Sequence, residues 1–331
     1  MSHAYPRHLD PGLLVRVLAD AGLIDGAPGV PHPVGGGTYN SVYRLDRRAG
    51  DLIVKVSPGP AAPVLSYEHG LLATEALFDE LAVAAGVPVP PVLHTEQHNA
   101  LLDGDVLVLG RCPGVPWRPA THTDANRRAV RHRLGRLTAR LHTVTGTGFG
   151  YPGGALGPLQ PRWDTAFRQM IDAVLADAAR FGARLPRPAA EIRDVVTAHA
   201  GALAAVTTPV LVHFDLWDGN ILVDRGTDGA RLTALIDAER AFWGDPIADF
   251  VSVALAGDVE QDTAFLDGYG ISVLDPPARL RLALYRVYLH LIMLVEAVPR
   301  NLPADHRWFL RQRIVPALIT DLTTLAREAP P

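Results

Sequence analysis

The chain has 331 residues, of which 48% are hydrophobic and 20% are charged, and its formal net charge is −4. This composition excludes a disordered protein, and the length suffices for one large or two ordinary domains with a substantial core. No block of basic residues occurs, which argues against nucleic acid as the main partner. Cys112 is the single cysteine, and no apolar run resembles a signal peptide or a membrane span. We therefore expect a cytoplasmic protein that binds no membrane, as a monomer or a homodimer.

The first predicted element is a helix that begins after Asp10 and ends near Ala21. Aspartate is a good N-cap, and the proline that follows it fits the first helical turn. The apolar face of this helix is predicted from residues at helical spacing: Leu13, Leu14, Val17 and Leu18. We interpret the helix as scaffold.

Three consecutive glycines, Gly35, Gly36 and Gly37, come next and precede predicted strands over residues 42–45 and 52–56. Glycines let the backbone approach phosphate groups with its N–H groups exposed. The pattern is not a P-loop, because no Gly-Lys-Ser/Thr follows. Taken alone, a triple glycine is more often just a flexible turn, but a strand-loop-strand that ends in the only lysine favours the phosphate-binding interpretation.

Lys55 is the only lysine among the 31 basic residues, and the other 30 are arginines. A chain that uses arginine almost everywhere else keeps lysine here, inside an apolar strand. A compact ammonium group differs from a planar guanidinium in size and donor geometry, which matters among phosphate oxygens. The pattern favours a phosphate-binding lysine over chance survival on a solvated surface.

Four residues at helical spacing form one face of a predicted helix over residues 67–85: Leu71, Glu75, Phe78 and Ala82. Glu75 is the charged residue on this apolar face, and a buried carboxylate needs a partner. Lys55 is the natural partner. Glu68, on the same face two turns earlier, is the second candidate, and a solvated Glu75 is the alternative.

A further strand is predicted over residues 105–110, and the chain after it has mainly helical patterns, apart from residues 208–237. The segment 111–117 contains two prolines and a glycine, which end that strand. Helices are predicted over residues 124–142, 164–180, 190–206, 262–266, 277–297 and 304–327.

The most informative stretch is residues 208–224, TPVLVHFDLWDGNILVD. Apolar runs over residues 210–212 and 221–223 predict two short strands that flank a polar loop. A third run, residues 232–236, follows a Gly-Thr-Asp-Gly turn and ends at Asp237. Hairpin pairing of this run with residues 221–223 would bring Asp237 beside Asn220.

The side chains of this loop suit phosphoryl transfer. That reaction needs an acceptor held in line and metal ions that neutralise charge on the phosphates. Asp215 is the candidate for orienting an acceptor hydroxyl. Asn220 and Asp237 offer the hard oxygen ligands that Mg²⁺ prefers. The alternative is that His213 and Asp215 are an ordinary pair of polar residues at a strand end and that Asp237 caps a helix.

The segments HFDLWDGNILVD, LIDAE and GDPIADF resemble the catalytic loop, the metal-binding Asp and the downstream GDP..D of the aminoglycoside phosphotransferase family. These proteins are relatives of the protein kinases that phosphorylate small molecules. The resemblance implies a bilobal α+β fold, with a small lobe of antiparallel sheet plus helix and a large, mainly helical lobe. The four matching pieces, namely the glycines, Lys55 with Glu75, the Asp215 loop and Asp237, cover most of the chain.

The resemblance also implies roles for residues outside the catalytic loop. Lys55, held by Glu75, would bind the nucleotide phosphates under the loop of Gly35, Gly36 and Gly37. The junction at Leu109 and Arg111 would be the hinge, where backbone groups hydrogen-bond the adenine. The lobe boundary then falls near Arg111, which divides the chain into residues 1–111 and 112–331.

Three further acidic residues follow Asp237. We expect Asp245 to cap a helix and Asp249 to support the catalytic loop by hydrogen bonds. Glu239 is a possible additional metal ligand.

Two departures from the family pattern lie in the catalytic loop. Phe214 stands where the family often has Gly, and Trp217-Asp218 stands where it often has His-Pro. Similar DLW loops occur in sugar-amine kinases of the same superfamily.

The leading expectation is therefore an O-phosphotransferase that uses ATP, or GTP, with Mg²⁺ to phosphorylate a hydroxyl of a small molecule. An antibiotic acceptor of aminoglycoside, macrolide or nucleoside type would give resistance by inactivation. The alternatives are a metabolic kinase for choline, homoserine or a sugar amine, and a nucleotide-binding regulator without catalysis. A protein kinase is disfavoured because no Asp-Phe-Gly or Ala-Pro-Glu follows the loop. A metal-dependent hydrolase that uses His213, Asp215, Asp237 and Asp249 lacks paired His ligands.

Charge bears on the acceptor. A polycationic aminoglycoside would favour an acidic cleft. One stretch supplies four carboxylates before the next basic residue: Asp258, Glu260, Asp262 and Asp267. The region after residue 301 has no such excess, so a weakly charged antibiotic is as well supported as an aminoglycoside.

Overall fold

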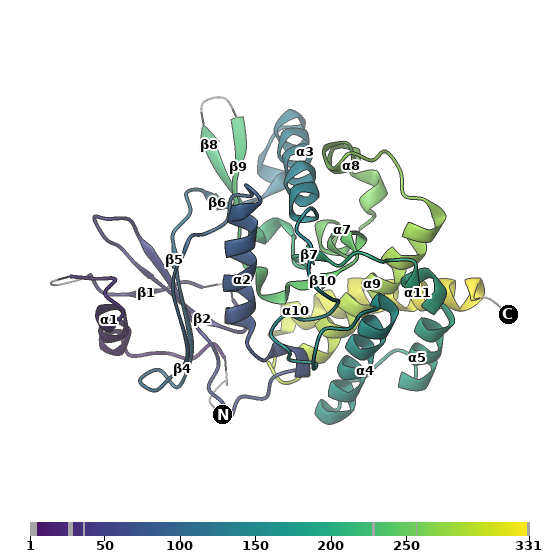
Figure 1. Cartoon of the computed structure of the whole chain (residues 1–331), viewed down its shortest axis with the longest axis horizontal. Coiled ribbons are helices and arrows are strands. Elements are labelled where there is room, and N and C mark those ends of the chain that lie inside the picture. The colour runs from purple at the N-terminus through teal and green to yellow at the C-terminus, as the bar shows by residue number, and fades with distance from the viewer. Residues whose placement is uncertain (1–4, 26–28, 36, 227–228, 256, 330–331) are drawn as a thin grey trace.

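The computed structural model describes residues 5–25, 29–35, 37–226, 229–255 and 257–329. Figure 1 shows an antiparallel sheet with its helices on the left and a larger, mainly helical part on the right. This arrangement confirms the predicted α+β class, with a sheet and helix followed by a helical region.

The sheet has five strands, all with antiparallel neighbours, and neither of its edge strands was expected from the sequence. The strand order is β1 (His32–Pro33), β2 (Ser41–Leu45), β3 (Leu52–Val56), β5 (Gly104–Gly110) and β4 (Val92–Asn99). Prolines precede β4, and its residues 94–98 are all polar, so it lacks the apolar pattern of a strand. An edge position tolerates this composition, because one side of the strand meets solvent.

Side chains along β3 alternate between two faces of the sheet, one packed against helix α1 (Pro11–Asp20) and the other turned towards helix α2 (Leu71–Ala84). Val54 and Val56 are buried on the face covered by α1. Ile53 packs on the opposite face, against α2. Lys55 has the same parity as Ile53, so it points to α2.

Helix α1 begins after its Asp10 cap, as predicted. Leu14, Val17 and Leu18 form its buried face, whereas Leu13 is 36% exposed. The prediction was wrong for Leu13, which lies at the margin of the apolar stripe.

Helix α2 begins four residues later than predicted. Residues Ser66–Glu68 form a separate 3₁₀ turn, and Gly70 has a φ of 72°, which interrupts the helical backbone before Leu71. Glu68 therefore does not share a helix face with Glu75.

The larger part contains the remaining helices: α3 (Asp124–Leu141), α4 (Trp163–Phe181), α5 (Ala189–Ala198), α6 (Ala200–Ala204), α7 (Asp249–Val253), α8 (Thr263–Tyr269), α9 (Pro276–Glu296), α10 (Ala304–Phe309) and α11 (Val315–Glu328). Two predicted helices are interrupted. The one over residues 190–206 breaks at His199 into α5 and α6, and the one over 304–327 contains a π-helical turn, Leu310–Ile314. None of the helices in the described ranges combines the length and apolar character of a membrane span.

Two small sheets position the polar loop. Strand β7 (Val210–Val212) pairs with β10 (Phe242–Gly244), and β6 (Val115–Pro116) joins the hairpin of β8 (Ile221–Gly226) and β9 (Gly229–Leu235). The predicted hairpin is confirmed, with Ile221 opposite Leu235. The backbone N–H of Ile236 donates to the Asn220 carbonyl at 3.0 Å, so Asn220 and Asp237 lie side by side.

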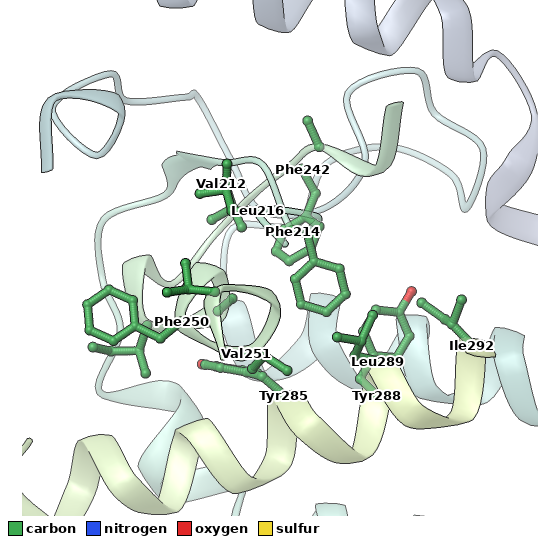
Figure 2. Packing of buried hydrophobic residues seen from close by; sticks show 14 of the residues in the cluster. Val212, Phe214, Leu216, Phe242, Phe250, Val251, Tyr285, Tyr288, Leu289 and Ile292 are labelled. Atoms are coloured by element: carbon green, nitrogen blue, oxygen red, sulfur yellow. The ribbon is translucent and has the colours of Figure 1, made fainter. Parts of the chain in front are cut away.

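Helix α9 forms the floor beneath the polar loop. Figure 2 shows its Tyr288, Leu289 and Ile292 packed below Phe214 and Phe242. The loop thus rests on the largest apolar core of the protein.

Candidate active site

An ion-paired group at the junction of the two parts contains three predicted site residues. The Lys55 ammonium lies 2.6 Å from Glu75 Oε1, and 2.6 Å from Asp237 Oδ1. Burial lowers the pKa of Lys55, but the carboxylates of Asp237 and Glu75 outweigh it, so the net pKa is raised. The predicted Lys55–Glu75 pair is present, and Lys55 also connects it to Asp237.

The two carboxylates differ in their electrostatics. Burial raises the pKa of Glu75 even though Lys55 opposes this change. Removal from water also raises the pKa of Asp237, but here the Lys55 ammonium dominates and holds it below its usual value. Asp237 is therefore the more acidic of the two carboxylates.

Glu239 lies close to this group. Carboxylate oxygens of Glu75, Asp237 and Glu239 lie within 4.8 Å of one another. Burial and the neighbouring Asp237 raise the pKa of Glu239 to about 8. Such a cluster of hard oxygen donors matches the chemistry of a divalent cation that prefers oxygen ligands.

Asp215 and Asn220 face each other across the polar loop, residues 213–220. Asn220 Nδ2 donates to Asp215 Oδ2 at 3.0 Å and to the Asp215 carbonyl at 2.9 Å. These bonds use the amide nitrogen of Asn220 and orient Asp215. Burial raises the pKa of Asp215 to about 6, although Arg240 opposes the shift.

Asp249 supports the backbone of the loop, as predicted. Its carboxylate accepts hydrogen bonds from the N–H groups of Phe214 at 2.7 Å and His213 at 3.2 Å. His142 Nε2 lies 3.0 Å from the same carboxylate, and its other nitrogen lies 2.8 Å from the Tyr269 hydroxyl. His142 could not be assigned to the loop from its position in the sequence, because it lies in α3, far from the loop along the chain.

Asp245 also has the structural role expected of it. It accepts from the Ile247 N–H at 3.0 Å, and its other oxygen accepts from Arg281 at 2.6 Å and from the Tyr285 hydroxyl at 2.7 Å. Asp245 therefore joins the segment after β10 to α9.

The backbone conformation at Phe214 accounts for the glycine that the family often has at this position. Its φ is 63°, a left-handed conformation that residues with a Cβ adopt at a free-energy cost. Its side chain is fully buried, with ring centroids 5.0 Å from Phe242 and 5.7 Å from Tyr288. Burial of the ring offsets the backbone strain and anchors the loop to the core (Figure 2).

A cleft of about 1530 Å³ joins these groups. Every predicted site residue that the structure describes lines it: Gly35, Gly37, Lys55, Glu75, Leu109, Arg111, Asp215, Asn220 and Asp237. Gly36 lies outside the described residues. The Arg111 N–H donates to the Asp51 carbonyl at 2.9 Å, so this N–H already has a partner within the chain.

Other cleft residues were not identified from the sequence. Trp217 and Trp308 line the cleft and are 45% and 63% exposed. The ring of Trp217 lies against Gly219, where a Cβ would be only 2.2 Å from the indole. Glu68, the second candidate partner of Lys55, pairs instead with Arg300, which also lines the cleft.

The chain matches a known protein family and the fold of many solved structures. The profile of the phosphotransferase enzyme family (APH) matches residues 31–285. No curated protein is significantly similar to the chain in sequence.

Two solved structures illustrate the shared fold. A Thermobifida fusca YX-ER1 protein, provisionally assigned as a fructosamine-3-kinase, is 24% identical over 92% of this chain and 98% of its own, with a TM-score of 0.65. A thermostable mutant of aminoglycoside phosphotransferase APH(4)-Ia, in ternary complex with ADP and hygromycin B, is 18% identical over 95% and 97%, with a TM-score of 0.62. The chain thus has the protein-kinase-like fold of these neighbours, and it belongs to the phosphotransferase enzyme family as a small-molecule phosphotransferase.

Proposed function

We propose that the protein transfers the γ-phosphate of ATP to a hydroxyl group of a small molecule. The observation that carries this proposal is the position of the Lys55 ammonium, 2.6 Å from both Glu75 and Asp237. A nucleotide-binding lysine must be held by a carboxylate and lie beside the metal-binding Asp, and Lys55 meets both conditions. The lobe boundary near Arg111 belongs to the same proposal.

Asp215 is proposed as the residue that orients the acceptor hydroxyl. Asn220 fixes its carboxylate, and a pKa of about 6 leaves it mostly ionised at neutral pH. An ionised carboxylate accepts a hydrogen bond from the hydroxyl and can take its proton as the bond to phosphorus forms. The chain then supplies orientation and proton transfer, and the reaction needs no covalent intermediate on the protein.

Asn220 and Asp237 are proposed as the Mg²⁺ ligands, with Glu239 beside them. The fit rests on their chemistry: an amide oxygen and carboxylates are hard donors, and the carboxylate oxygens of Asp237 and Glu239 already lie close together. When bound, Mg²⁺ would neutralise charge on the phosphate oxygens.

ATP is the proposed donor, and GTP is possible. Solved neighbours carry ADP or AMP-PNP together with hygromycin B. In this chain, Gly35 and Gly37 line the same cleft as Lys55, and so do Leu109 and Arg111. These residues would hold the phosphates and the base, respectively.

We further propose a weakly charged antibiotic, such as a macrolide or a nucleoside, as the acceptor. Of the acidic stretch after residue 257, only Asp258 is among the described residues that line the cleft. Glu260 pairs with Arg279 at 2.7 Å, and Asp262 pairs with Arg131. These carboxylates are therefore not available to attract a polycation.

Part of the remaining cleft wall is apolar and aromatic, beside the charged or polar side chains of Asp305 and His306. It is lined by Leu289, Met293, Leu302, Phe309 and the two exposed tryptophans, Trp217 and Trp308. Surfaces of this kind bind acceptors that have apolar faces or flat rings.

A sugar-amine kinase is the second candidate. The exposed Trp217, two residues after Asp215, favours it, because an indole ring can stack on a sugar. The same exposed indoles would also suit the quaternary ammonium of choline, whereas a homoserine kinase and a non-catalytic regulator lack a comparable observation in their favour.

The test is nucleotide consumption with Mg²⁺ across macrolides, nucleoside antibiotics, aminoglycosides, choline, homoserine and amino sugars. The product should gain the mass of one phosphate. Phosphorylation of an antibiotic supports the first candidate, and phosphorylation of a sugar amine alone supports the second. Absence of both nucleotide binding and turnover would overturn the kinase proposal.

A further inference from the structure

A second charged cluster lies between the candidate site and the helical part. We call it the Arg300 cluster, and it consists of Glu68, Arg240, Glu296 and Arg300. Arg240 Nη2 lies 2.8 Å from Glu296 Oε2, Arg300 Nη2 lies 3.2 Å from the same oxygen, and Arg300 also pairs with Glu68. The four side chains are only 1% to 11% exposed. Positive and negative charges alternate, so the cluster is neutral as a whole.

Arg300 connects this cluster to the residues that follow the glycines. Its Nη1 donates to the Thr38 hydroxyl at 3.0 Å, and its guanidinium lies 5.1 Å from the centre of the Tyr39 ring. The Tyr39 hydroxyl donates to the Glu68 carbonyl at 2.9 Å. One guanidinium therefore fixes both residues of the loop against the end of α9.

The other side of the loop end is also held. Asn40 Nδ2 donates to Glu239 Oε2 at 2.5 Å. Glu239 follows Asp237 by two residues, and Arg240 of the Arg300 cluster comes next. The loop end, Thr38 to Asn40, is thus joined to both the Asp237 segment and the end of α9.

Stability alone does not explain this arrangement. Removing four charges from water is costly, and buried ion pairs can often be replaced by apolar side chains without loss of stability. Their better-attested contribution is a fixed geometry. The planar fork of arginine suits this purpose, because it bonds several partners in set directions at once.

We propose that Arg300 is a positioning residue that holds the loop end Thr38–Asn40 over the cleft in the geometry required for nucleotide binding. The proposal rests on the proposed function, since the loop would cover the phosphates of ATP. It adds a residue from the far C-terminal side of the chain to the nucleotide site. Thr38, Tyr39, Asn40 and Arg300 all line the same cleft as Lys55 and Asp237.

The test compares the ATP dissociation constants of Arg300→Met and the wild-type protein, measured by calorimetry with Mg²⁺ and without any acceptor. Loss of the guanidinium should weaken ATP binding about tenfold, the effect expected when a charged hydrogen-bonding group is removed. Arg300→Lys keeps the charge but not the fork, so it should recover only part of the affinity.

Arg286→Met is the matched control. Arg286 lies on the same stretch of chain, in α9, and pairs with Asp321 at 2.6 Å, but it does not line the cleft. Its loss should lower the melting temperature and leave ATP affinity unchanged. Thr38→Val removes a single half-buried hydroxyl, so it keeps the test open if Arg300→Met fails to fold.

Thr38→Val should weaken ATP binding about two- to threefold, and the double variant with Arg300→Met should be no weaker than Arg300→Met alone. This non-additivity would support the proposal. ATP affinities of Arg300→Met and Thr38→Val within twofold of the wild type would overturn it. Failure of the wild-type protein to bind ATP would instead contradict the proposed function.

Discussion

The two sides of the cleft are held by different kinds of interaction. On the nucleotide side, Lys55 is fixed by ion pairs with Glu75 and Asp237, at 2.6 Å each. On the other side, where Asp215 is proposed to meet the acceptor, the polar loop is fixed by the buried ring of Phe214 and by backbone hydrogen bonds to Asp249. Ion pairs can exchange partners when phosphates and cations arrive. A buried ring has no such alternative partner, because leaving its pocket would expose it to water.

This difference matches the two proposed tasks of the cleft, which are to bind a nucleotide and to position an acceptor hydroxyl. A nucleotide brings its own charge, so the ion pairs of the group proposed to contact its phosphates, Lys55, must be able to rearrange. In the proposed reaction an acceptor hydroxyl must meet a carboxylate at a fixed place, and the contacts of Phe214 and Asp249 give Asp215 a rigid base for that role. Changes on the acceptor side should therefore affect turnover or folding, and changes on the nucleotide side should affect binding.

The largest effect is expected for Asp215→Ala. Turnover should fall about 10²–10⁴-fold, the contribution of a positioned acid or base, because no group remains to orient the hydroxyl. ATP affinity should stay within about twofold, since Asp215 serves the acceptor side. Steady-state kinetics and nucleotide titration on the same preparation check both statements. Wild-type turnover in this variant would show that Asp215 has a different role.

Phe214→Ala should lower the free energy of unfolding by about 3–5 kcal/mol, the usual loss for a buried phenylalanine. Because φ is 63°, Phe214→Gly should be more stable than Phe214→Ala by about 1 kcal/mol. Phe242, a buried neighbour in β10 without a positive φ, is the control, and there glycine should be the less stable replacement. Denaturant unfolding of the Ala and Gly variants at Phe214 and Phe242 measures these stabilities. If Ala is more stable than Gly at both positions, backbone strain at Phe214 is contradicted.

His290 should make folding stability depend on pH. Burial in α9 lowers its pKa from 6.5 to about 4, with Asp321 opposing and Arg286 assisting the shift. The unfolded chain therefore binds the proton first, so stability is full above pH 6.5 and falls as the pH decreases towards 4. The loss reaches at most about 3 kcal/mol, at 1.4 kcal/mol per pKa unit. His290→Leu should flatten this part of the curve, and an unchanged slope in the variant would assign the dependence to other groups.

The smallest effect is expected for Lys55→Arg. The charge is kept, so the ion pairs with Glu75 and Asp237 can persist and the melting temperature should change little. The planar guanidinium places its donors differently among phosphate oxygens, and ATP affinity should fall about tenfold. Lys55→Met, which leaves Glu75 and Asp237 without their cation, should lose both affinity and stability. ATP binding by Lys55→Arg at wild-type strength would mean that the single lysine survives by chance.

The parts of the site that could be predicted are those encoded by neighbouring residues. The loop from His213 to Asn220 and the hairpin that returns at Asp237 lie within one short stretch. The pairing of Lys55 with Glu75 could be predicted because a charged residue in an apolar pattern needs a partner.

The missed parts depend on contacts between distant segments. Arg300 meets Glu68 across 232 residues, and Asn40 meets Glu239 across 199. His142 likewise reaches Asp249 from another helix. Arginine, glutamate and asparagine are ordinary surface residues in any local pattern, so only the folded chain reveals which of them are buried together.

The distribution of tryptophans makes their intrinsic fluorescence a reporter of acceptor binding. Trp117, Trp163 and Trp243 are at most 8% exposed, whereas Trp217 and Trp308 are exposed within the cleft. A quencher dissolved in water therefore reaches mainly the two indoles that an incoming acceptor would cover. Protection of the intrinsic fluorescence from acrylamide would reveal an acceptor, even one that the enzyme holds but does not phosphorylate, without any label or coupled assay.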